Sequence, residues 1–150
     1  MARPKRRRFM STPPKVEGFR PFGTPMSQID PVVLLYEEYE AINLADYQNL
    51  THEEASVKME VSRPTFTRIY NEARKTVAAA FVEGRAIIIK GGDFHSEDFW
   101  YRCQACDRTS TSKKELNHCP HCGSDDIIWL NESSTPLYRR RGERRGEGRG

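Results

Sequence analysis

Residues 51–84 read THEEASVKMEVSRPTFTRIYNEARKTVAAAFVEG, and this stretch predicts two helices joined by a tight turn. Thr51, followed three residues later by Glu54, forms a capping box, in which each residue bonds to the backbone N–H of the other. The capping box predicts a short helix over residues 52–59. Glu60 and Val61 then interrupt the helical pattern.

The second helix begins after Ser62, which is a good N-cap residue. Pro64 lies in its first turn, where the missing N–H of proline removes no hydrogen bond. Gly84 is expected to close the helix, because glycine readily adopts the left-handed conformation found at helix ends. Between these limits, apolar residues recur at helical spacing. They are Phe66, Ile69, Tyr70, Ala73, Val77, Ala80 and Phe81.

A short helix, a tight turn and a capped basic helix form the pattern of a DNA-binding helix-turn-helix. Ser56 supplies the small side chain needed where the two helices cross. Glu60 fits less well, because the turn residue usually takes a positive φ and is glycine; another residue there should cost ~1 kcal/mol. The alternative interpretation is an ordinary helical hairpin whose polar face is only solvated.

The outward face of the second helix carries the residues that would read DNA. In a helix-turn-helix the first turns of this helix enter the major groove. Arg68 is long enough to bond guanine O6 and N7, and Asn71 has the groups that pair with adenine. Glu72 lies on the same polar face, while Arg74 and Lys75 are expected to meet phosphates. The predicted DNA-contacting residues are Arg63, Thr65, Thr67, Arg68, Asn71, Arg74 and Lys75.

Charge is unevenly distributed along the 150-residue chain, although its formal net charge is only +3. Residues 1–20 carry seven Lys or Arg against one Glu, and residues 29–62 carry eight acids against one Lys. Residues 63–92 carry six bases against two Glu. The second helix is therefore the basic side of an otherwise acidic domain, which suits attraction of one face toward phosphates.

The apolar content of 37% is low, so a small core is expected. No apolar run is long enough to span a bilayer, and the N-terminus is too polar for a signal peptide. We therefore expect no membrane partner and a cytoplasmic location, where cysteines stay reduced.

Both ends of the chain are basic. Residues 1–25 combine a Lys/Arg cluster with prolines, which predicts an arm along DNA phosphates or in a minor groove; the alternative is a solvated terminus. Residues 131–150 form an arginine- and glycine-rich tail that we expect to be disordered. The tail either adds sequence-independent affinity for nucleic acid or only solubilises the end.

The rest of the predicted DNA-binding domain, residues 26–92, contains one more helix and a strand. Residues 32–35 are β-favouring, so we expect them to be extended and the first helix to begin at about Tyr36. After Gly84, residues 86–90 read AIIIK and predict a short buried strand. This strand could form a small wing with residues 16–22.

Three segments carry a resemblance to a known family. They are MARPKRRR at the start, EYEAINLAD at residues 38–46, and EEASVKMEVSRPTFTRIYNEARKTVAAAFVEGRAIIIKGG at residues 53–92. The chain resembles the family called domain of unknown function 134, small bacterial and archaeal proteins. The resemblance covers roughly the first two thirds of the chain. It implies a DNA-binding fold with a helix-turn-helix similar to the DNA-reading end of sigma factors. It implies no particular DNA target.

The chain departs from the family pattern at Glu60, where glycine is usual, and at Asn43, where arginine is common.

A second module follows the polar linker that we assign to residues 93–98. Residues 99–130 hold the pattern C-x2-C-x12-C-x2-C, formed by Cys103, Cys106, Cys119 and Cys122. This is close to the spacing of a four-thiolate zinc site. Gly123 and Asp107 follow the two pairs, at positions where a positive φ turns backbone N–H groups toward the sulfurs. With strands at Phe99–Tyr101 and residues 127–130, the module is typical of a zinc ribbon holding one structural Zn²⁺.

The pair Cys119-Pro120-His121-Cys122 also matches the dithiol of thioredoxin-like oxidases, in which proline and histidine lower the thiol pKa. That chemistry needs a βαβ domain around the motif, and the chain offers only a short segment with another cysteine pair beside it. No phosphate loop, H-E-x-x-H or nucleophile–base signature is present, so we do not predict an enzyme.

These observations predict a mainly α fold: a three-helix helix-turn-helix domain, like sigma-factor region 4, followed by a small β zinc ribbon with disordered basic ends. The predicted function is sequence-specific binding of double-stranded DNA, as a transcriptional regulator. The alternative is an adaptor that docks through the ribbon on transcription machinery such as RNA polymerase. The sequence leaves open whether the protein forms a homodimer, and which DNA it binds.

Overall fold

The computed structural model describes residues 8–132. Residues 1–7, which hold most of the basic cluster of the predicted arm, lie outside the described residues, as do residues 133–150 of the predicted tail. Over residues 8–132 the chain forms three α-helices, one 3-10 helix, one π-helix and eight strands in three sheets.

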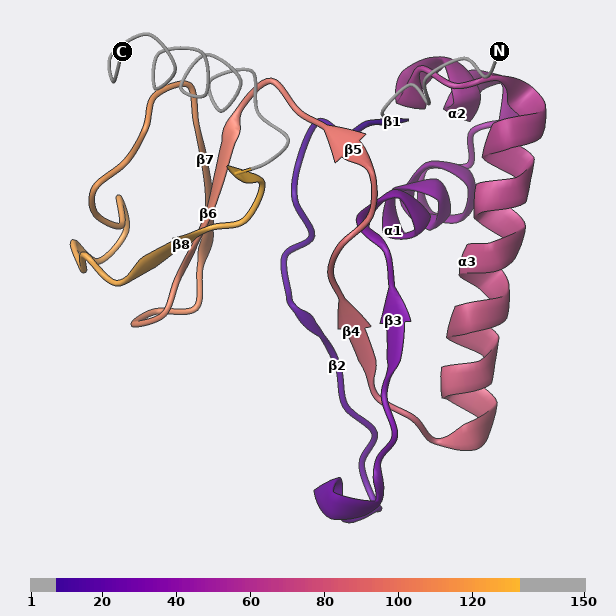
Figure 1. Cartoon of the computed structure of the whole chain (residues 1–150), viewed down its shortest axis with the longest axis horizontal. Helices are drawn as coiled ribbons and strands as arrows, with labels where there is room; N and C mark the ends of the chain where they lie inside the picture. Colours follow the sequence, from indigo (N-terminus) through magenta and orange to yellow (C-terminus); the bar gives the residue numbers. More distant parts are fainter. Residues whose placement is uncertain (1–7, 133–150) are drawn as a thin grey trace, which may run out of the picture. The chain divides into compact units, whose positions relative to one another are not determined.

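The strands and helices follow one another in a mixed order (Figure 1). The strands are β1 Arg8–Phe9, β2 Gly18–Phe19, β3 Val32–Leu34, β4 Ile87–Ile89, β5 Phe94–His95, β6 Phe99–Cys103, β7 Thr109–Ser112 and β8 Ile127–Trp129. The helices are the 3-10 helix η1 Met26–Gln28, α1 Tyr36–Ile42, the π-helix η2 Asn43–Tyr47, α2 His52–Met59 and α3 Arg63–Glu83.

The predicted fold class, mainly α with a three-helix domain like sigma-factor region 4 followed by a small zinc ribbon, is therefore wrong. The described chain has eight strands in three sheets, and two of these sheets involve segments on either side of the helices. The physical reason is that strand pairing joins segments far apart in sequence, which the local apolar period of a helix does not reveal. Even residues 93–98, interpreted as a linker, contain β5.

The described residues divide into two compact units. The first unit comprises residues 8–10 and 16–94, and the second comprises residues 11–15 and 95–132. No helix among the described residues is long and apolar enough to cross a bilayer.

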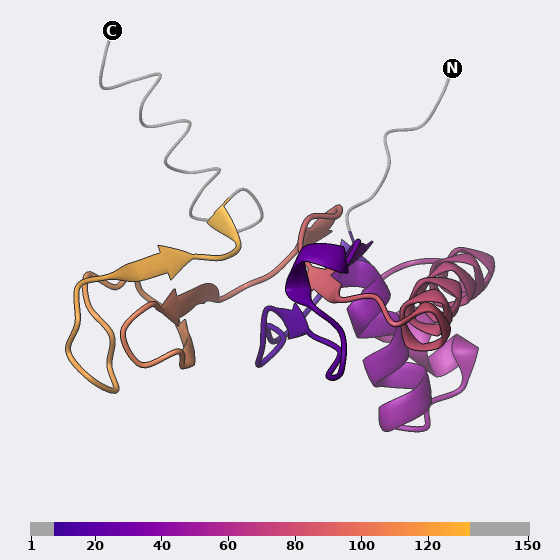
Figure 2. The same ribbon diagram turned by 90° about the horizontal axis from the view of Figure 1, so that it is seen from below.

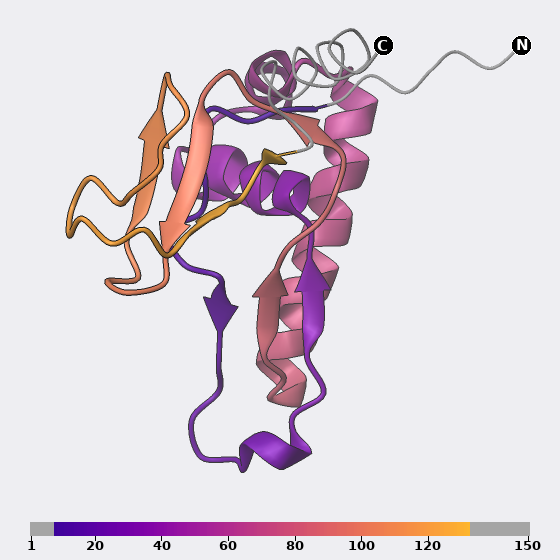
Figure 3. The same cartoon turned by 60° about the vertical axis from the view of Figure 1, so that its left-hand side comes forward.

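A three-stranded sheet in the order β2-β4-β3 supports the first unit. The pairing of β2 with β4 is antiparallel, with Phe19 opposite Ile87, and it confirms the predicted wing. The pairing of β3 with β4 is parallel, with Val33 opposite Ile88. Figure 3 shows β3 and β4 side by side along α3. The three helices thus lie in the connection between two parallel neighbours, which parallel pairing requires to be long.

The helices of the first unit pack together on one side of it (Figure 2). Their core is a cluster of seven buried residues: Ala41, Leu44, Ala55, Met59, Phe66, Ile69 and Tyr70. Further along α3, Ala73 packs against Leu34 of β3 and Ile89 of β4. Of the seven residues in the predicted apolar stripe of α3, five are buried and Val77 is half-buried, but Phe81 is 87% exposed, so the prediction is wrong for Phe81.

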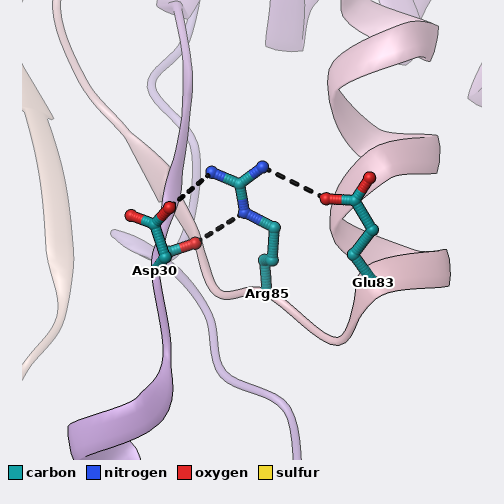
Figure 4. Close-up of polar contacts among 3 residues, drawn as sticks. All are labelled: Asp30, Glu83 and Arg85. Carbon is teal, nitrogen blue, oxygen red and sulfur yellow. Dashed lines mark hydrogen bonds and ion pairs between the residues drawn. The ribbon is translucent and has the colours of Figure 1, made fainter.

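Two arginines, Arg85 and Arg8, form ion pairs between segments of this unit that are far apart in sequence. Arg85, just after α3, donates from Nε to the carbonyl oxygen of Asp30 at 2.6 Å and lies 3.3 Å from its carboxylate. Arg85 also pairs with Glu83 at 3.2 Å (Figure 4). β1 pairs with β5, and the buried Arg8 lies 3.6 Å from Glu37 and 3.7 Å from Asp93.

The second unit is built on an antiparallel sheet in the order β7-β6-β8. Every residue of β6 is buried. Asn131 is fully buried and ties this sheet together, because its Oδ1 accepts hydrogen bonds from the Trp100 backbone at 2.9 Å and from Trp129 Nε1 at 3.0 Å. Its Nδ2 donates to the carbonyl oxygen of Asp98.

Candidate functional site

The turn between α2 and α3 has the backbone that the sequence predicts. Glu60 adopts a left-handed conformation with φ 59° and ψ 41°. The next N–H, that of Val61, donates to the carbonyl oxygen of Ser56 at 3.0 Å. The buried Ser56 hydroxyl donates to the carbonyl oxygen of Glu53 at 2.7 Å, so a small polar side chain sits where α2 approaches α3. This closed turn fixes the start of α3 relative to α2.

Both helices of this pair begin at the predicted caps. The hydroxyl of Thr51 accepts from the Glu54 N–H at 3.1 Å, and Glu54 Oε1 accepts from the Thr51 N–H at 2.9 Å. The Thr51 N–H, and next to it the Thr51 hydroxyl, hold the pKa of Glu54 below its usual range, because hydrogen bonding to the carboxylate favours its charged form. At α3, Ser62 Oγ accepts from the Thr65 N–H at 3.3 Å.

An open hollow runs along the first half of α3, and we call it the α3 hollow. It is lined by Pro64 and by six polar side chains. These are Arg63, Thr67, Arg68, Asn71, Glu72 and Lys75. Five of the seven predicted DNA-contacting residues are therefore brought to one surface. Glu72 is the one carboxylate in this lining, and it lies 3.6 Å from Lys75.

A second open hollow, the turn hollow, lies beside the α2–α3 turn. Its lining includes Thr65 and Arg68 of α3, Ser62 before the helix, and Arg8 of β1. Arg68 lines both hollows and therefore stands at their junction. From the sequence, Arg8 is only one charge of the N-terminal arm. No local signal marks its place, which depends on its pairing with Glu37 and Asp93.

The remaining predicted contact, Arg74, lies away from both hollows. Its guanidinium stacks 5.4 Å from the centre of the Tyr70 ring. Thr67, although it lines the α3 hollow, also bonds through Oγ1 to His52 Nδ1 at 2.8 Å. The ring of His52 in turn contacts Phe66 and Tyr70 edge-on. The polar face of α3 is thus partly fixed by contacts from α2.

The four cysteines of the second unit meet in one cluster. Their Sγ atoms all lie within 4.8 Å of one another. The distance from Cys103 Sγ to Cys122 Sγ is 3.6 Å, and from Cys106 Sγ to Cys119 Sγ it is 3.8 Å. Four sulfurs placed tetrahedrally around an ion at about 2.3 Å would be about 3.8 Å apart. The spacing therefore fits a four-thiolate metal site.

The two loops that carry these cysteines have matching backbone hydrogen bonds. The Asp107 N–H donates to the Cys103 carbonyl oxygen at 2.9 Å, and the Gly123 N–H donates to that of Cys119 at 2.9 Å. Asp107 and Gly123 both take positive φ, 61° and 81°, as the sequence predicts. Each turn directs further N–H groups at sulfur, such as Cys106 N to Cys103 Sγ at 3.4 Å.

The thiols of this cluster cannot all ionise independently. Burial of Cys119 opposes its ionisation, but the N–H groups of Cys122 and His121 bond to its sulfur and lower its pKa to about 7. The N–H of Ser124 favours ionisation of Cys122. The contact of the Cys122 sulfur with the Cys103 sulfur, together with the neighbouring Cys106 and Cys119 thiols, nevertheless raises the pKa of Cys122 to about 11. Four thiolates so close together require a cation to balance their charge.

Comparison with known proteins places this architecture in a family. A family model described as "Protein of unknown function DUF134" matches residues 1–97. The chain belongs to this family. The matched residues include all of the first unit, with its sheet, its three helices and both hollows.

The similarity to individual relatives extends further. A UPF0251 protein of Chloroherpeton thalassium is 38% identical over 129 residues, which cover 85% of each chain. A UPF0251 protein of Clostridium acetobutylicum is 41% identical over 130 residues, covering 85% of this chain and 91% of the relative. One of Methanothermobacter thermautotrophicus is 38% identical over 151 residues, covering 100% of this chain and 79% of the relative. These alignments run past residue 97 into the four-cysteine segment. No solved structure matches the chain.

Proposed function

We propose that this protein binds double-stranded DNA through the first half of α3, as a transcriptional regulator. The observation that carries the proposal is the α3 hollow, where six polar side chains of one helix line one open surface. Three of them, Arg63, Arg68 and Lys75, are cations, while Asn71 can bond adenine. A polar helix face directly after a rigid capped turn is the surface that enters a major groove in many DNA-binding proteins.

The charge around this surface supports the same proposal. Two acidic residues of α1, Glu37 and Glu40, are buried, and the acids of α2 lie in its first turn, at the capping box. The base-rich face of α3 is exposed, with Arg68 and Lys75 open to solvent. An exposed basic face attracts phosphates to this side of the unit.

The N-terminal arm forms part of the proposal. Arg8 lines the turn hollow together with Thr65 and Arg68, and it is held there by two carboxylates. The preceding segment carries Arg3, Lys5, Arg6 and Arg7 in sequence. We propose that these four cations contact DNA phosphates, adding affinity that falls as salt rises.

We further propose that the four-cysteine cluster binds one structural Zn²⁺. The sulfur spacing and the N–H groups directed at sulfur support a closed tetrahedral site, in which zinc holds a small unit together. Because thiolates persist as metal ligands only where they stay reduced, this proposal includes a cytoplasmic location.

The experiment compares two variants of α3 on two DNA probes. The probes are a duplex selected from a random library by the wild-type protein and a scrambled duplex of the same length. Arg68→Ala should weaken binding to the selected duplex by ~1–3 kcal/mol and reduce the preference over the scrambled one. Lys75→Ala should weaken both about equally and lower the slope of affinity against salt by about one ion.

Neither variant should change the melting temperature, because Arg68 and Lys75 are exposed. If Arg68→Ala remains folded and binds both duplexes as the wild type does, α3 does not read DNA. The adaptor interpretation would then be the better supported one.

A further inference from the structure

The last turns of α3 present an apolar surface that no other described part of the first unit covers. Phe81 is 87% exposed and Val82 is 80% exposed, and Ala78 beside them is also exposed. We call these three residues the α3 end patch. Large apolar side chains exposed together on a helix are unfavourable in water and commonly mark an interaction surface.

The end patch is held in place by ordered contacts. Gly84 closes α3 in a left-handed conformation, and its N–H donates to the carbonyl oxygen of Ala80. Directly after it, Arg85 links Glu83 to Asp30, which anchors the helix end to the segment before β3 (Figure 4). The patch therefore has a defined geometry.

The position of the patch along α3 matches the spacing of half-sites on DNA. Ala80 marks the middle of the patch along the helix axis. Arg68, at the junction of the two hollows, lies twelve residues before it, and at about 1.5 Å per residue this is about 18 Å along α3. Two copies that pack their end patches antiparallel about a two-fold axis would place their Arg68 residues about 36 Å apart. One turn of B-DNA separates the half-sites of dimeric DNA-binding proteins by about 34–36 Å.

The direction of the patch agrees with this arrangement. At about 100° per residue, Phe81 projects about 140° and Val82 about 40° around α3 from Arg68, so the centre of the patch lies roughly a quarter turn from it. A contact through the patch therefore leaves both hollows uncovered and allows both to face the same side of the assembly. In a two-fold dimer both copies use the same surface, so Phe81 of one copy can pack on Val82 of the other.

We propose that the α3 end patch is a contact between two copies of this chain bound to neighbouring half-sites on DNA. This inference rests on the DNA-binding function proposed above. Three side chains per copy bury much less than the ~800 Å² per partner of a stable interface. The contact is therefore weak in the free protein and forms when DNA brings two copies together, which raises their effective concentration.

The test uses the full chain and duplexes carrying two selected half-sites in inverted orientation. Their centres are separated by 10 base pairs in one duplex and by 15 in the other, which places the second site on the opposite side of the helix. Two copies of the wild type should bind each duplex at both spacings. At 10 base pairs the second copy should bind at least about tenfold more tightly than the first, and at 15 base pairs it should show no such gain. Phe81→Ser should lose this gain and keep its affinity for a single half-site.

Phe19→Ser is the matched control, since Phe19 is 60% exposed on β2 and lies outside the patch. It should behave as the wild type does. A wild type that binds single half-sites without any gain at 10 base pairs overturns the dimer contact and leaves DNA binding intact. A gain that survives in Phe81→Ser also overturns it. Failure to bind any duplex removes the DNA-binding function and the dimer contact together.

Discussion

The hydroxyl of Tyr70 donates a 2.7 Å hydrogen bond to Asp46 Oδ1, which links α3 to the π-helical turn Asn43–Tyr47. This bond raises the pKa of Tyr70, because it stabilises the protonated phenol next to a carboxylate. The same ring stacks against Phe66 and carries Arg74 over its face. The middle of α3 is thereby fixed to the end of the first helical segment.

We predict that Tyr70→Phe lowers the free energy of unfolding by about 1 kcal/mol, because it removes this hydrogen bond and keeps the ring packing. Denaturation in urea measures the change. Asp46→Asn is the control, because its amide oxygen can still accept from Tyr70 and should cost less. An unchanged midpoint for Tyr70→Phe would show that water replaces the Tyr70 hydroxyl as the partner of Asp46 without loss.

Two left-handed residues give opposite predictions. Glu60 has φ 59°, which is costly for a residue with a side chain, so Glu60→Gly should stabilise the protein by up to about 1 kcal/mol. Gly84 has φ 68°, and a Cβ added there would meet no atom within 4 Å, so Gly84→Ala should cost about 1 kcal/mol through backbone strain alone. Thermal melting of both variants checks the pair. Equal shifts in the same direction would contradict it.

Glu40 makes the stability of the first unit depend on pH. Burial raises its pKa, although Asn43 Nδ2 donates to Oε1 at 3.0 Å and Lys58 favours the charged form. A raised pKa means that the folded state binds the proton more tightly than the unfolded state does. The stability from this group is therefore complete below the unfolded pKa and is lost as pH rises through the folded pKa.

We accordingly predict that Glu40→Gln is more stable than the wild type at neutral pH, because glutamine avoids a buried charge and can still accept from Asn43. The advantage should shrink as pH is lowered toward the pKa of Glu40. Urea denaturation at several pH values measures the difference. A difference that does not vary with pH would show that ionisation of Glu40 is not its cause.

Metal removal should affect the two units differently. Chelation, or Cys103→Ser, should unfold the sheet β7-β6-β8, because the cysteine loops at one end of this small unit then lose their common ligand. The helical signal in circular dichroism should remain, since no cysteine lies in the first unit. His121→Ala is the control, because His121 contributes its backbone N–H to Cys119 and its side chain is not needed. Elemental analysis should give about one zinc per wild-type chain, and a metal-free protein with four reactive thiols would contradict the proposal.

Local sequence signals were sufficient where neighbouring residues determine the structure. The caps at Thr51 and Ser62, the left-handed Glu60 and the end of α3 at Gly84 all depend on contacts within a few residues, and each is confirmed. The same holds for the positive φ of Asp107 in the first cysteine loop.

Local sequence signals did not predict the structure where residues far apart in the chain determine it. β7 reads Thr-Ser-Thr-Ser, which has no apolar alternation, and its extended form comes from pairing with β6. β1 and β5 are two residues each, and their pairing occurs beside the ion pairs of Arg8 with Glu37 and Asp93, which no local pattern marks. Phe81 continues the apolar period of α3, but it is exposed while Ala80, one residue earlier, is buried, so Phe81 faces away from the packed side of the helix.

The parallel pairing of β3 with β4 also constrains the order in which the first unit folds. The residues flanking these strands, Asp30 and Arg85, are 55 positions apart, and all three helices lie between them. Closing so long a loop is entropically costly until the intervening chain is compact, so the helices should assemble before the strands pair. Substitutions such as Ile89→Val should then speed unfolding and leave the refolding rate almost unchanged.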